Sequence, residues 1–199
     1  MAERRRVPKQ ARSRALWDAI LEAGARVLVE QGYEKASTGR IARRAGVSVG
    51  SLYQYFADKD AVFTALTARI IDAVGMAGAQ ALTAPGLTLH QRVALGLRGG
   101  FAAFEKHPGL LRQLGAISGS GFVDRLEQNK AVVRALVAAT LRQHPAVTLP
   151  DTDLAARLLI DATEGLLLNL TPDDDPDVLA DEGARLLLAY CGIAPESGA

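Results

Sequence analysis

Between Ser37 and Lys59 the sequence concentrates side chains that can bind phosphates and base edges. Ser37 and Ser48 each precede a short helical pattern, where a serine oxygen can accept a hydrogen bond from an unpaired first-turn N–H group. The polar groups of the second pattern, with the cation that follows it, are Ser51, Tyr53, Gln54, Tyr55 and Lys59. Hydroxyl and ammonium groups suit phosphate oxygens, and a glutamine amide suits an adenine edge. This stretch is therefore typical of nucleic-acid recognition.

Two short helices separated by a tight turn must position these side chains. We predict them over residues 37–45 and 48–56, with Gly46 giving the backbone the freedom that a sharp turn needs. Their apolar positions are Ile41, Ala42, Ala45, Leu52 and Phe56. A helix, a glycine-containing turn and a second helix form the helix-turn-helix motif, whose second helix enters a DNA major groove. An ordinary helical hairpin is the alternative, and the polar face of the second helix favours DNA binding.

Catalytic chemistry has little support in the sequence. Asp161 and Glu164 lie on one apolar helical pattern, where they could act as an acid–base pair. Salt bridges at an interface, to Arg157 or Arg185, are the favoured alternative. We find no set of nucleophile, base and orienting residue and no glycine-rich phosphate loop. The sequence therefore does not indicate an enzyme.

Metal binding is also poorly supported. The three histidines, at positions 90, 107 and 144, have no metal-ligand spacing. The aspartates at residues 173–175 could hold a divalent cation. They stand at the start of a helical pattern, however, where the helix dipole favours negative charge. We expect no metal ion and no cofactor.

The composition predicts an all-α protein. The chain has 199 residues, of which 49% are hydrophobic and only 5% aromatic, and no long segment alternates cleanly between apolar and polar residues. Residues 1–60 carry 12 Lys and Arg against 7 Asp and Glu, whereas residues 61–199 carry 11 against 15. A basic first part on an acidic body suggests a polyanion partner for the first part only.

The cysteine content and the apolar runs suggest a cellular location. The one cysteine, Cys191, excludes a disulfide within the chain, which fits a reducing compartment, and we expect it to be a small apolar packing residue. No apolar segment follows the N-terminal arginines, and charges interrupt the apolar runs before they reach membrane-spanning length. We expect a cytoplasmic protein with no membrane partner.

About nine helices are expected, in three regions. Residues 1–13 would form a basic flexible arm, residues 14–75 a helix-turn-helix DNA-binding domain with three core helices, and residues 76–199 a helical dimerisation and effector-binding domain. A fourth helix should start after Asp58 and end near residues 75–78. The last region has helical segments over residues 88–106, 108–117, 122–143, 154–170 and 176–190.

The last two helical patterns are apolar on more than one face. Leucine runs at residues 166–168 and 186–188 put large side chains on adjacent faces, and a helix that is apolar nearly all round is usually buried nearly all round. In a small helical body this favours a homodimer that pairs through a four-helix bundle. The residues expected at this interface are Leu158, Ala162, Gly165, Leu166, Leu186 and Tyr190.

The order of residues in the helix-turn-helix stretch resembles the TetR (tetracycline repressor) family of bacterial transcriptional regulators. The matching residues are Ile41-Ala42, Ala45-Gly46-Val47-Ser48, Gly50, Leu52-Tyr53, Tyr55-Phe56 and Lys59. The resemblance covers roughly residues 14–75, and residues 76–199 share only the all-helical character of the family's C-terminal domains. It implies a regulator that dimerises and binds an effector through its C-terminal domain.

The resemblance also implies which residues contact DNA. In the family these contacts come from the caps of the two short helices, from the exposed face of the second and from the lysine that opens the next helix. The corresponding residues here are Ser37, Thr38, Ser48, Val49, Gly50, Ser51, Tyr53, Gln54, Tyr55 and Lys59. Many relatives have a polar or basic residue in place of Val49, which would limit base recognition there to methyl contacts. Many have an aliphatic residue in place of Thr38, which is either a DNA-facing hydroxyl or part of the cap.

We therefore expect a dimeric transcriptional regulator, most simply a repressor, that binds a palindromic operator in double-stranded DNA. An unknown small-molecule effector would release it by entering the C-terminal body. The candidate pocket residues are Phe101, Phe104, Leu114, Phe122, Leu126, Gln128 and Asn129. The alternative is a helical ligand-binding protein or enzyme that retains the N-terminal fold without sequence-specific DNA binding.

Overall fold

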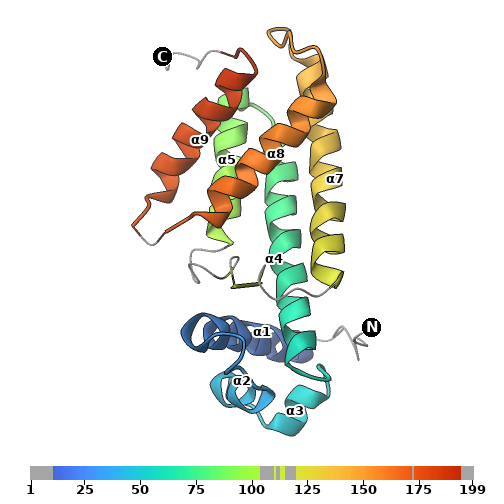
Figure 1. The fold of residues 1–199 in the computed structure, drawn as a ribbon, viewed down its shortest axis with the longest axis vertical. Coiled ribbons are helices and arrows are strands. Elements are labelled where there is room, and N and C mark those ends of the chain that lie inside the picture. Colours follow the sequence, from blue (N-terminus) through green and yellow to red (C-terminus); the bar gives the residue numbers. More distant parts are fainter. Residues whose placement is uncertain (1–10, 104–109, 111–112, 115–119, 172, 194–199) are drawn as a thin grey trace. The chain divides into compact units, whose positions relative to one another are not determined.

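The computed structural model describes residues 11–103, 110, 113–114, 120–171 and 173–193, with the side chains of all but residues 11, 12 and 120–126. Eight helices and no strand occur in these ranges (Figure 1), which confirms the predicted all-α fold. Most of the expected arm, residues 1–10, lies outside the described residues, as does most of the helix expected over residues 108–117.

The contacts within the chain define two units. One contains Met1–Ile70 and His107–Val123, and the other contains Ile71–Lys106 and Asp124–Ala199. Helix α4 (Lys59–Leu82) and helix α7 (Ser120–Gln143) contribute residues to both units. The boundaries of these two units differ from those of the domains expected over residues 14–75 and 76–199. The two domains therefore stay a prediction.

In the first unit, α1 (Ala11–Gln31), α2 (Thr38–Ala45), α3 (Val49–Tyr53) and the start of α4 enclose an apolar core. Its largest buried side chains are Ile20, Leu21, Val27, Leu28, Ile41, Leu52, Phe56, Val62, Phe63 and Leu66. Trp17 packs on Phe56 with 4.3 Å between the ring centroids. The three-and-four spacing of these residues in α1 and α4 is what makes one face of each helix apolar.

Serine caps start both short helices, as the sequence predicts. The Ser37 hydroxyl accepts a hydrogen bond from the Arg40 N–H at 3.3 Å, and the Ser48 hydroxyl accepts one from the Ser51 N–H at 3.0 Å. The second short helix is shorter than expected. Its helical residues end at Tyr53 rather than at residue 56.

Gly46 makes the turn between these helices. The Val47 N–H donates to the Ala42 carbonyl at 3.0 Å and the Gly46 N–H to the Arg43 carbonyl at 3.2 Å, the pair of bonds that defines a Schellman motif. Gly46 has a φ of 70°, in the left-handed region that costs any residue with a side chain. The direction in which α3 leaves α2 therefore depends on this glycine.

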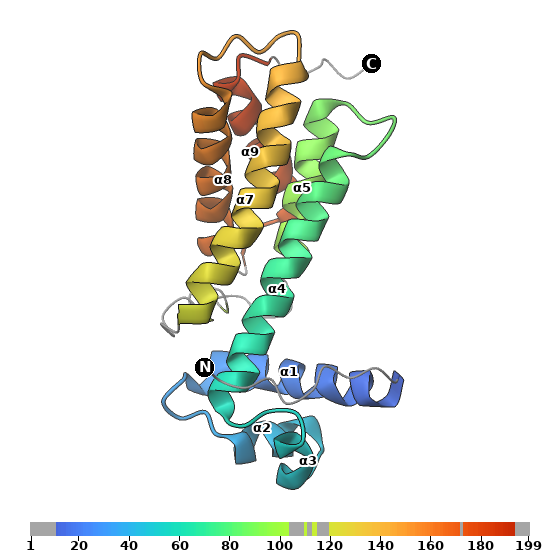
Figure 2. The ribbon, with the colours of Figure 1, turned by 90° about the vertical axis from the view of Figure 1, so that its right-hand side faces the viewer.

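The second unit is a helical bundle made by the later part of α4, α5 (Leu89–Ala102), α7, α8 (Thr152–Leu168) and α9 (Pro176–Tyr190), grouped together in Figure 2. One core cluster joins α5 to α9 through Ala94, Leu97, Phe101, Ala180, Ala184 and Leu187. A second joins Leu141 of α7 and Ala155 of α8 to Cys191. Cys191 is thus a packing residue, as expected, and burial raises the pKa of its thiol.

Side-chain caps also start the helices of the second unit. Thr88 and Gln91 form a reciprocal capping box at α5. Asp151 caps α8, and Asp175 caps α9 with Pro176 in the first turn. Each of these starts agrees with the sequence, because the cap residue immediately precedes an apolar helical pattern.

Helix α4 continues to Leu82, beyond the end predicted near residues 75–78. Gly78 lies inside the helix, next to α5: a Cβ placed on Gly96 of α5 would lie 3.6 Å from the Gly78 Cα. Of the described helices, only α4 is long and apolar enough to cross a membrane. Val62, Phe63 and Leu66 of this helix are buried in the core of the first unit.

Candidate nucleic-acid interface

The residues predicted to contact DNA lie on the outer side of α2 and α3 and at the start of α4. Six of them are exposed, namely Ser37, Ser48, Val49, Gly50, Tyr53 and Gln54. The partly buried ones are Thr38, Ser51, Tyr55 and Lys59. Leu52 and Phe56 are buried between them, at 0% and 2% exposure. Because the apolar residues alternate with the polar ones, α3 packs on the core and presents its other face outward.

A hydroxyl pair connects the two short helices. Thr38 Oγ1, in the first residue of α2, lies 3.2 Å from the Tyr53 hydroxyl, in the last residue of α3. A hydroxyl can make more than one hydrogen bond, so both groups retain capacity for a phosphate oxygen. The Thr38 hydroxyl therefore lies beside a predicted contact residue, whereas the cap itself is formed by Ser37.

The start of α3 is built from small residues. The Ser48 hydroxyl, which caps the helix, also lies 2.8 Å from the Ser51 hydroxyl. A Cβ placed on Gly50 would come no closer than 3.8 Å to any neighbour, so packing within the chain does not require glycine there. Small side chains on an exposed helix start allow a nucleic-acid backbone to come close.

The side chains of Gln54 and Tyr55 differ in how firmly the rest of the chain holds them. Gln54 is exposed, and its amide has no hydrogen-bond partner among the described side chains. Tyr55 is partly buried, with its ring edge-on to Trp17 at 6.2 Å and 80°. We infer that Gln54 is free to meet a base edge, whereas Tyr55 is held in place by its ring.

Lys59, the predicted phosphate contact, already has partners inside the unit. Its Nζ donates to the Tyr33 carbonyl at 3.0 Å and lies 3.9 Å from the centroid of the Tyr33 ring. These contacts account for a cation in the first turn of α4, where the helix dipole disfavours one. An ammonium group has three N–H donors, so Lys59 can still donate to a phosphate.

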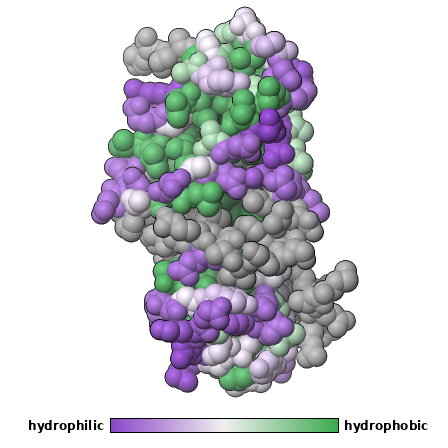
Figure 3. Space-filling view, in the orientation of Figure 1, coloured by the Kyte–Doolittle hydropathy of each residue, from purple (hydrophilic) through white to green (hydrophobic). Residues whose placement is uncertain are grey.

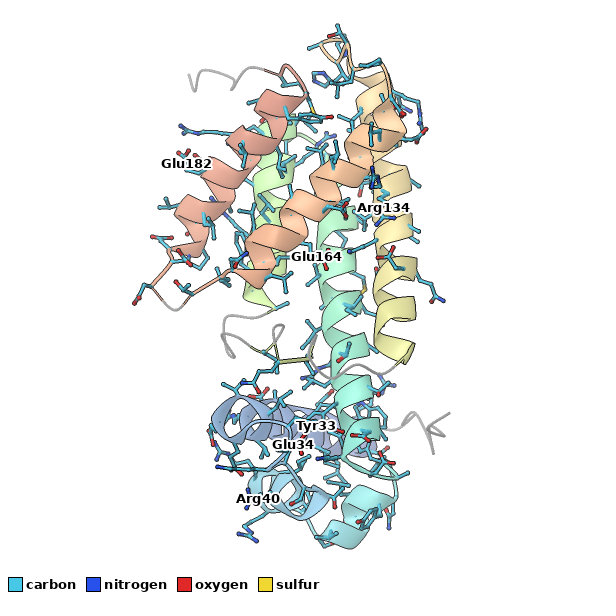
Figure 4. The ribbon with its side chains drawn as sticks, in the orientation of Figure 1. Tyr33, Glu34, Arg40, Arg134, Glu164 and Glu182 are labelled. Atoms are coloured by element: carbon cyan, nitrogen blue, oxygen red, sulfur yellow. The ribbon has the colours of Figure 1, made fainter. Side chains whose placement is uncertain are left out.

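Tyr33 also holds the next residue of α4. Its hydroxyl donates to Asp60 Oδ1 at 2.5 Å, and its ring packs 5.9 Å from that of Phe63. The hydrogen bond to Asp60, followed by burial and nearby negative charges, raises the pKa of Tyr33 to about 12. Tyr33, labelled in Figure 4, thus ties the start of α4 to the loop after α1.

Two arginines that the sequence left unassigned join α2 to the end of α1. Arg40, labelled in Figure 4, donates from Nη1 to Gln31 Oε1 at 2.7 Å, and Arg44 forms an ion pair with Glu30. These partners are brought together by the packing of α2 against the end of α1. The spacing of residues in the sequence does not indicate them. Arg43 is exposed and has no ion-pair partner among the described residues. It therefore adds an unneutralised positive charge to this unit.

The seven candidate effector residues have different surroundings. Phe101 is buried in the α5–α9 cluster, Leu114 is buried in the first unit, and Gln128 is exposed. Asn129 donates a hydrogen bond to Asp72 of α4. Phe104 lies outside the described residues, as do the side chains of Phe122 and Leu126. The effector pocket stays a prediction.

Large apolar side chains remain exposed on α8 and α9, where Figure 3 shows hydrophobic surface. Leu158 on α8 is 43% exposed, and Leu186 and Tyr190 on α9 are 63% and 47% exposed. These three belong to the predicted dimer interface. Single exposed leucines are common, but several on two neighbouring helices form the kind of patch that a partner covers.

The small residues predicted for the same interface have mixed environments. Ala162 is exposed, and a Cβ placed on Gly165 would have no neighbour within 4 Å. Leu166 points inward instead, with its Cδ1 3.2 Å from a Cβ placed on Gly183. Leu166 is partly buried against the α5–α9 cluster, and its place in the interface stays a prediction.

The two carboxylates of α8 pair with α7 and not with the arginines expected from the sequence. Glu164 accepts a hydrogen bond from Lys130 Nζ at 2.5 Å, and Asp161 lies 3.9 Å from Arg134 Nη2. Figure 4 shows Arg134 and Glu164 on these neighbouring helices. The expected partners were Arg157 and Arg185. The cations sit on α7 because α7 packs against α8, a contact that sequence spacing does not reveal.

Two of the aspartates before α9 accept hydrogen bonds from nearby residues of the chain. Asp175 accepts hydrogen bonds from the N–H groups of Asp177 and Val178. Asp174 accepts two from Thr171, which lowers the pKa of this carboxyl. Within the described ranges, no group of three or more His, Cys, Asp or Glu side chains could hold a metal ion.

A comparison with protein families decides the identity of this module. Residues 20–66 match the model described as "Bacterial regulatory proteins, tetR family". This segment is of the TetR family. The matched segment holds most of α1, all of α2 and α3 and the start of α4, which are the elements that position the interface. Residues 20–66 are accordingly a helix-turn-helix segment of the kind found in bacterial regulatory proteins.

Curated proteins similar to this chain include a receptor protein and a helix-turn-helix-type transcriptional regulator. The A-factor receptor protein of Streptomyces griseus is 45% identical over 58 residues, which cover 29% of this chain and 21% of the receptor. The transcriptional regulator AlkX of Mycobacterium tuberculosis is 24% identical over 194 residues, covering 97% of this chain and 83% of AlkX. This chain spans only 21% to 32% of the length of three curated relatives, the Streptomyces griseus receptor among them.

The fold of the whole chain also has solved counterparts. The fatty acid degradation regulator FadR from Bacillus halodurans matches with a TM-score of 0.75 at 19% identity, over 92% of this chain and 97% of that one. At this identity the likeness concerns the fold alone. The helices of this chain therefore follow the same fold as that protein, although most of their residues differ.

Proposed function

We propose that this chain is a homodimeric repressor of the TetR family, which binds a palindromic operator in double-stranded DNA and leaves it when a small molecule binds the second unit. The observation that carries the proposal is the outer face of α2 and α3. Exposed hydroxyl and amide groups there surround the end of a capped helix whose opposite face is buried. Such a helix can enter a major groove without disturbing the core.

The side chains divide between positioning and base recognition. Thr38, Tyr53 and Lys59 present hydroxyl and ammonium donors that suit phosphates. Gln54 is the exposed amide that suits an adenine edge, and Val49, 41% exposed, can contact a thymine methyl. With so few base-reading groups in each copy, selectivity requires two copies on two half-sites.

The exposed apolar residues of α8 and α9 support the dimer. Burying Leu158, Leu186 and Tyr190 against the same residues of a second copy would remove apolar area from water. A twofold dimer places its two recognition helices one DNA turn apart, roughly 34 Å, or a multiple of it. The operator is therefore a palindrome in this proposal.

The effector acts by differential binding in this proposal. A ligand that binds better to the form unable to span both half-sites shifts the equilibrium away from DNA. An apolar or aromatic molecule is the expected class, because the candidate pocket residues are mainly apolar. In this proposal the protein blocks transcription while it is bound to the operator. Effector binding releases it from the DNA, and transcription then begins.

Selection of DNA from a random-sequence duplex library tests the proposal. The purified protein should enrich palindromic fragments and retard them in a gel at low salt. A protein that enriches no sequence, yet is folded and helical by circular dichroism, would favour the alternative of a ligand-binding protein or enzyme that retains the fold.

A further inference from the structure

A polar contact joins α7 to α4 within the second unit. Asn129 Nδ2 donates to Asp72 Oδ1 at 3.1 Å. The Asn129 side chain also occupies the space next to Gly75, one turn further along α4. A Cβ placed on Gly75 would lie 2.0 Å from Asn129 Oδ1 and 2.9 Å from its Cγ. In this position the Asn129 amide leaves no room for a side chain at residue 75.

This contact explains why a glycine stands inside a long helix. Glycine costs helix stability, and α4 continues for seven residues beyond Gly75, so the glycine does not end the helix. Gly78 lies in the same helix, and a Cβ placed on it would have no neighbour within 4 Å. Of these two glycines, only Gly75 is required by the Asn129 contact.

The next residue of α7 makes a second polar contact, to α8. Lys130 Nζ donates to Glu164 at 2.5 Å and lies 3.5 Å from Glu127, and its side chain is only 13% exposed. Consecutive residues of α7 thus bind α4 and α8. Helix α8, which carries exposed residues of the predicted dimer interface, is therefore linked to α4 through two adjacent residues of α7.

We propose that Asn129 is a latch that holds α4 in the form that binds DNA. This inference rests on the proposed repressor function and specifies its regulation. Helix α4 runs without interruption from Lys59, a predicted phosphate contact, to Gly75 and beyond. Loss of the Asn129–Asp72 bond weakens the hold of α7 on α4 and lowers the population of the DNA-binding form. Effector binding in the second unit acts by opening the same contact.

A matched pair of glycine substitutions tests the latch. Gly75→Ala and Gly78→Ala both raise helix propensity, but only Gly75→Ala displaces the Asn129 amide. With duplex DNA selected from a random library as probe, Gly75→Ala should weaken binding about tenfold, a typical size for coupling between sites. Gly78→Ala should bind within about twofold of the wild type, as expected for a substitution that meets no neighbour.

An exchange of the two polar groups gives an independent test. Asn129→Asp places two carboxylates against each other and should weaken DNA binding like Gly75→Ala. The double variant Asp72→Asn with Asn129→Asp restores an amide opposite a carboxylate with the roles exchanged, and it should recover binding. Hydrogen exchange in the absence of DNA should show faster amide exchange around residues 72–78 in both weakened variants and not in the double variant.

Three results would overturn the latch. One is wild-type affinity for DNA in Gly75→Ala and Asn129→Asp; another is a double variant that binds as poorly as Asn129→Asp. A third is a loss of binding that follows a loss of dimer mass or a fall in Tm, because the contact would then be purely structural. If the wild-type protein itself selects no DNA, the proposed function fails and the latch fails with it.

Discussion

Lys59 shows how one residue can serve both the fold and DNA. Its contacts with the Tyr33 carbonyl and ring hold the start of α4, and its remaining N–H donors suit a phosphate. A structural cation and a phosphate contact have different experimental signatures. The first affects the free energy of unfolding, and the second affects how DNA affinity depends on salt.

We predict that Lys59→Ala changes both quantities. The slope of log K against log salt concentration should flatten by about one unit, because one phosphate contact is lost. Tm should also fall. Arg98→Ala, which removes an exposed cation of the second unit, is the control and should leave the slope unchanged. DNA titrations at several salt concentrations measure this slope. An unaltered slope for Lys59→Ala would mean that the lysine stabilises the fold and does not contact a phosphate.

Tyr33 predicts a specific loss of stability at high pH. Its pKa is raised from 10.0 to about 12 in the folded chain, so the folded state holds the phenolic proton more tightly than the unfolded state does. The resulting stability is complete below pH 10 and is lost as pH rises from 10 towards 12. Urea unfolding should show a constant stability difference between wild type and Tyr33→Phe up to about pH 10 and a shrinking one above it. A constant difference throughout would contradict the Asp60 hydrogen bond.

At the residue scale, the sequence predicts local features of the site but not contacts between distant residues. Ser37 and Ser48 were identifiable as caps because a cap and its helix are adjacent in the chain. The Thr38–Tyr53 hydroxyl pair was not, because it depends on the angle between α2 and α3. The same reason applies to Lys59, whose partner Tyr33 lies 26 residues away.

At the element scale, helix starts were more predictable than helix ends. Thr88, Asp151 and Asp175 cap helices by bonds to residues two or three positions later, so their role can be seen in the sequence. The end of α4 was misplaced because Gly75 and Gly78 read as terminators. Both lie inside the helix, where Gly75 accommodates Asn129, a packing reason that only the tertiary structure shows.

The turn between α2 and α3 gives an element-scale prediction. Gly46→Ala forces a side chain into a left-handed conformation and should lower the free energy of unfolding by about 1–2 kcal/mol. Gly39→Ala is the matched control within α2, because a Cβ there meets no neighbour, and it should raise stability through helix propensity. Chemical denaturation of both variants measures this. Equal effects of the two substitutions would contradict the turn geometry.

At the scale of the whole molecule, the sequence predicted the fold better than the regulatory site. Apolar periodicity identifies helices, and leucine runs on two faces identified α8 and α9 as carrying exposed apolar residues. The pocket residues were harder to predict, because inward apolar residues serve packing and ligand binding alike. Phe101 illustrates this, since it fills the core between α5 and α9.

Dimerisation yields a prediction for the assembled molecule. Leu158→Arg puts a charge into the proposed interface and should shift the protein to a monomer, with a large loss of operator affinity. Val132→Arg is the control: Val132 is 66% exposed on α7, outside the predicted interface, and its substitution should leave the dimer intact. Sedimentation at micromolar concentration reports the mass. A dimeric Leu158→Arg protein would place the interface elsewhere.

The most direct test of the account is the stoichiometry of the complex with a selected palindromic duplex. Sedimentation of that complex at low salt should give the mass of one duplex with two protein chains, or with a multiple of two. A half-site duplex should bind far more weakly, because the second set of contacts is lost. Equal affinity for the half-site and the palindrome, or a complex with a single chain, would contradict a dimeric regulator that reads two half-sites.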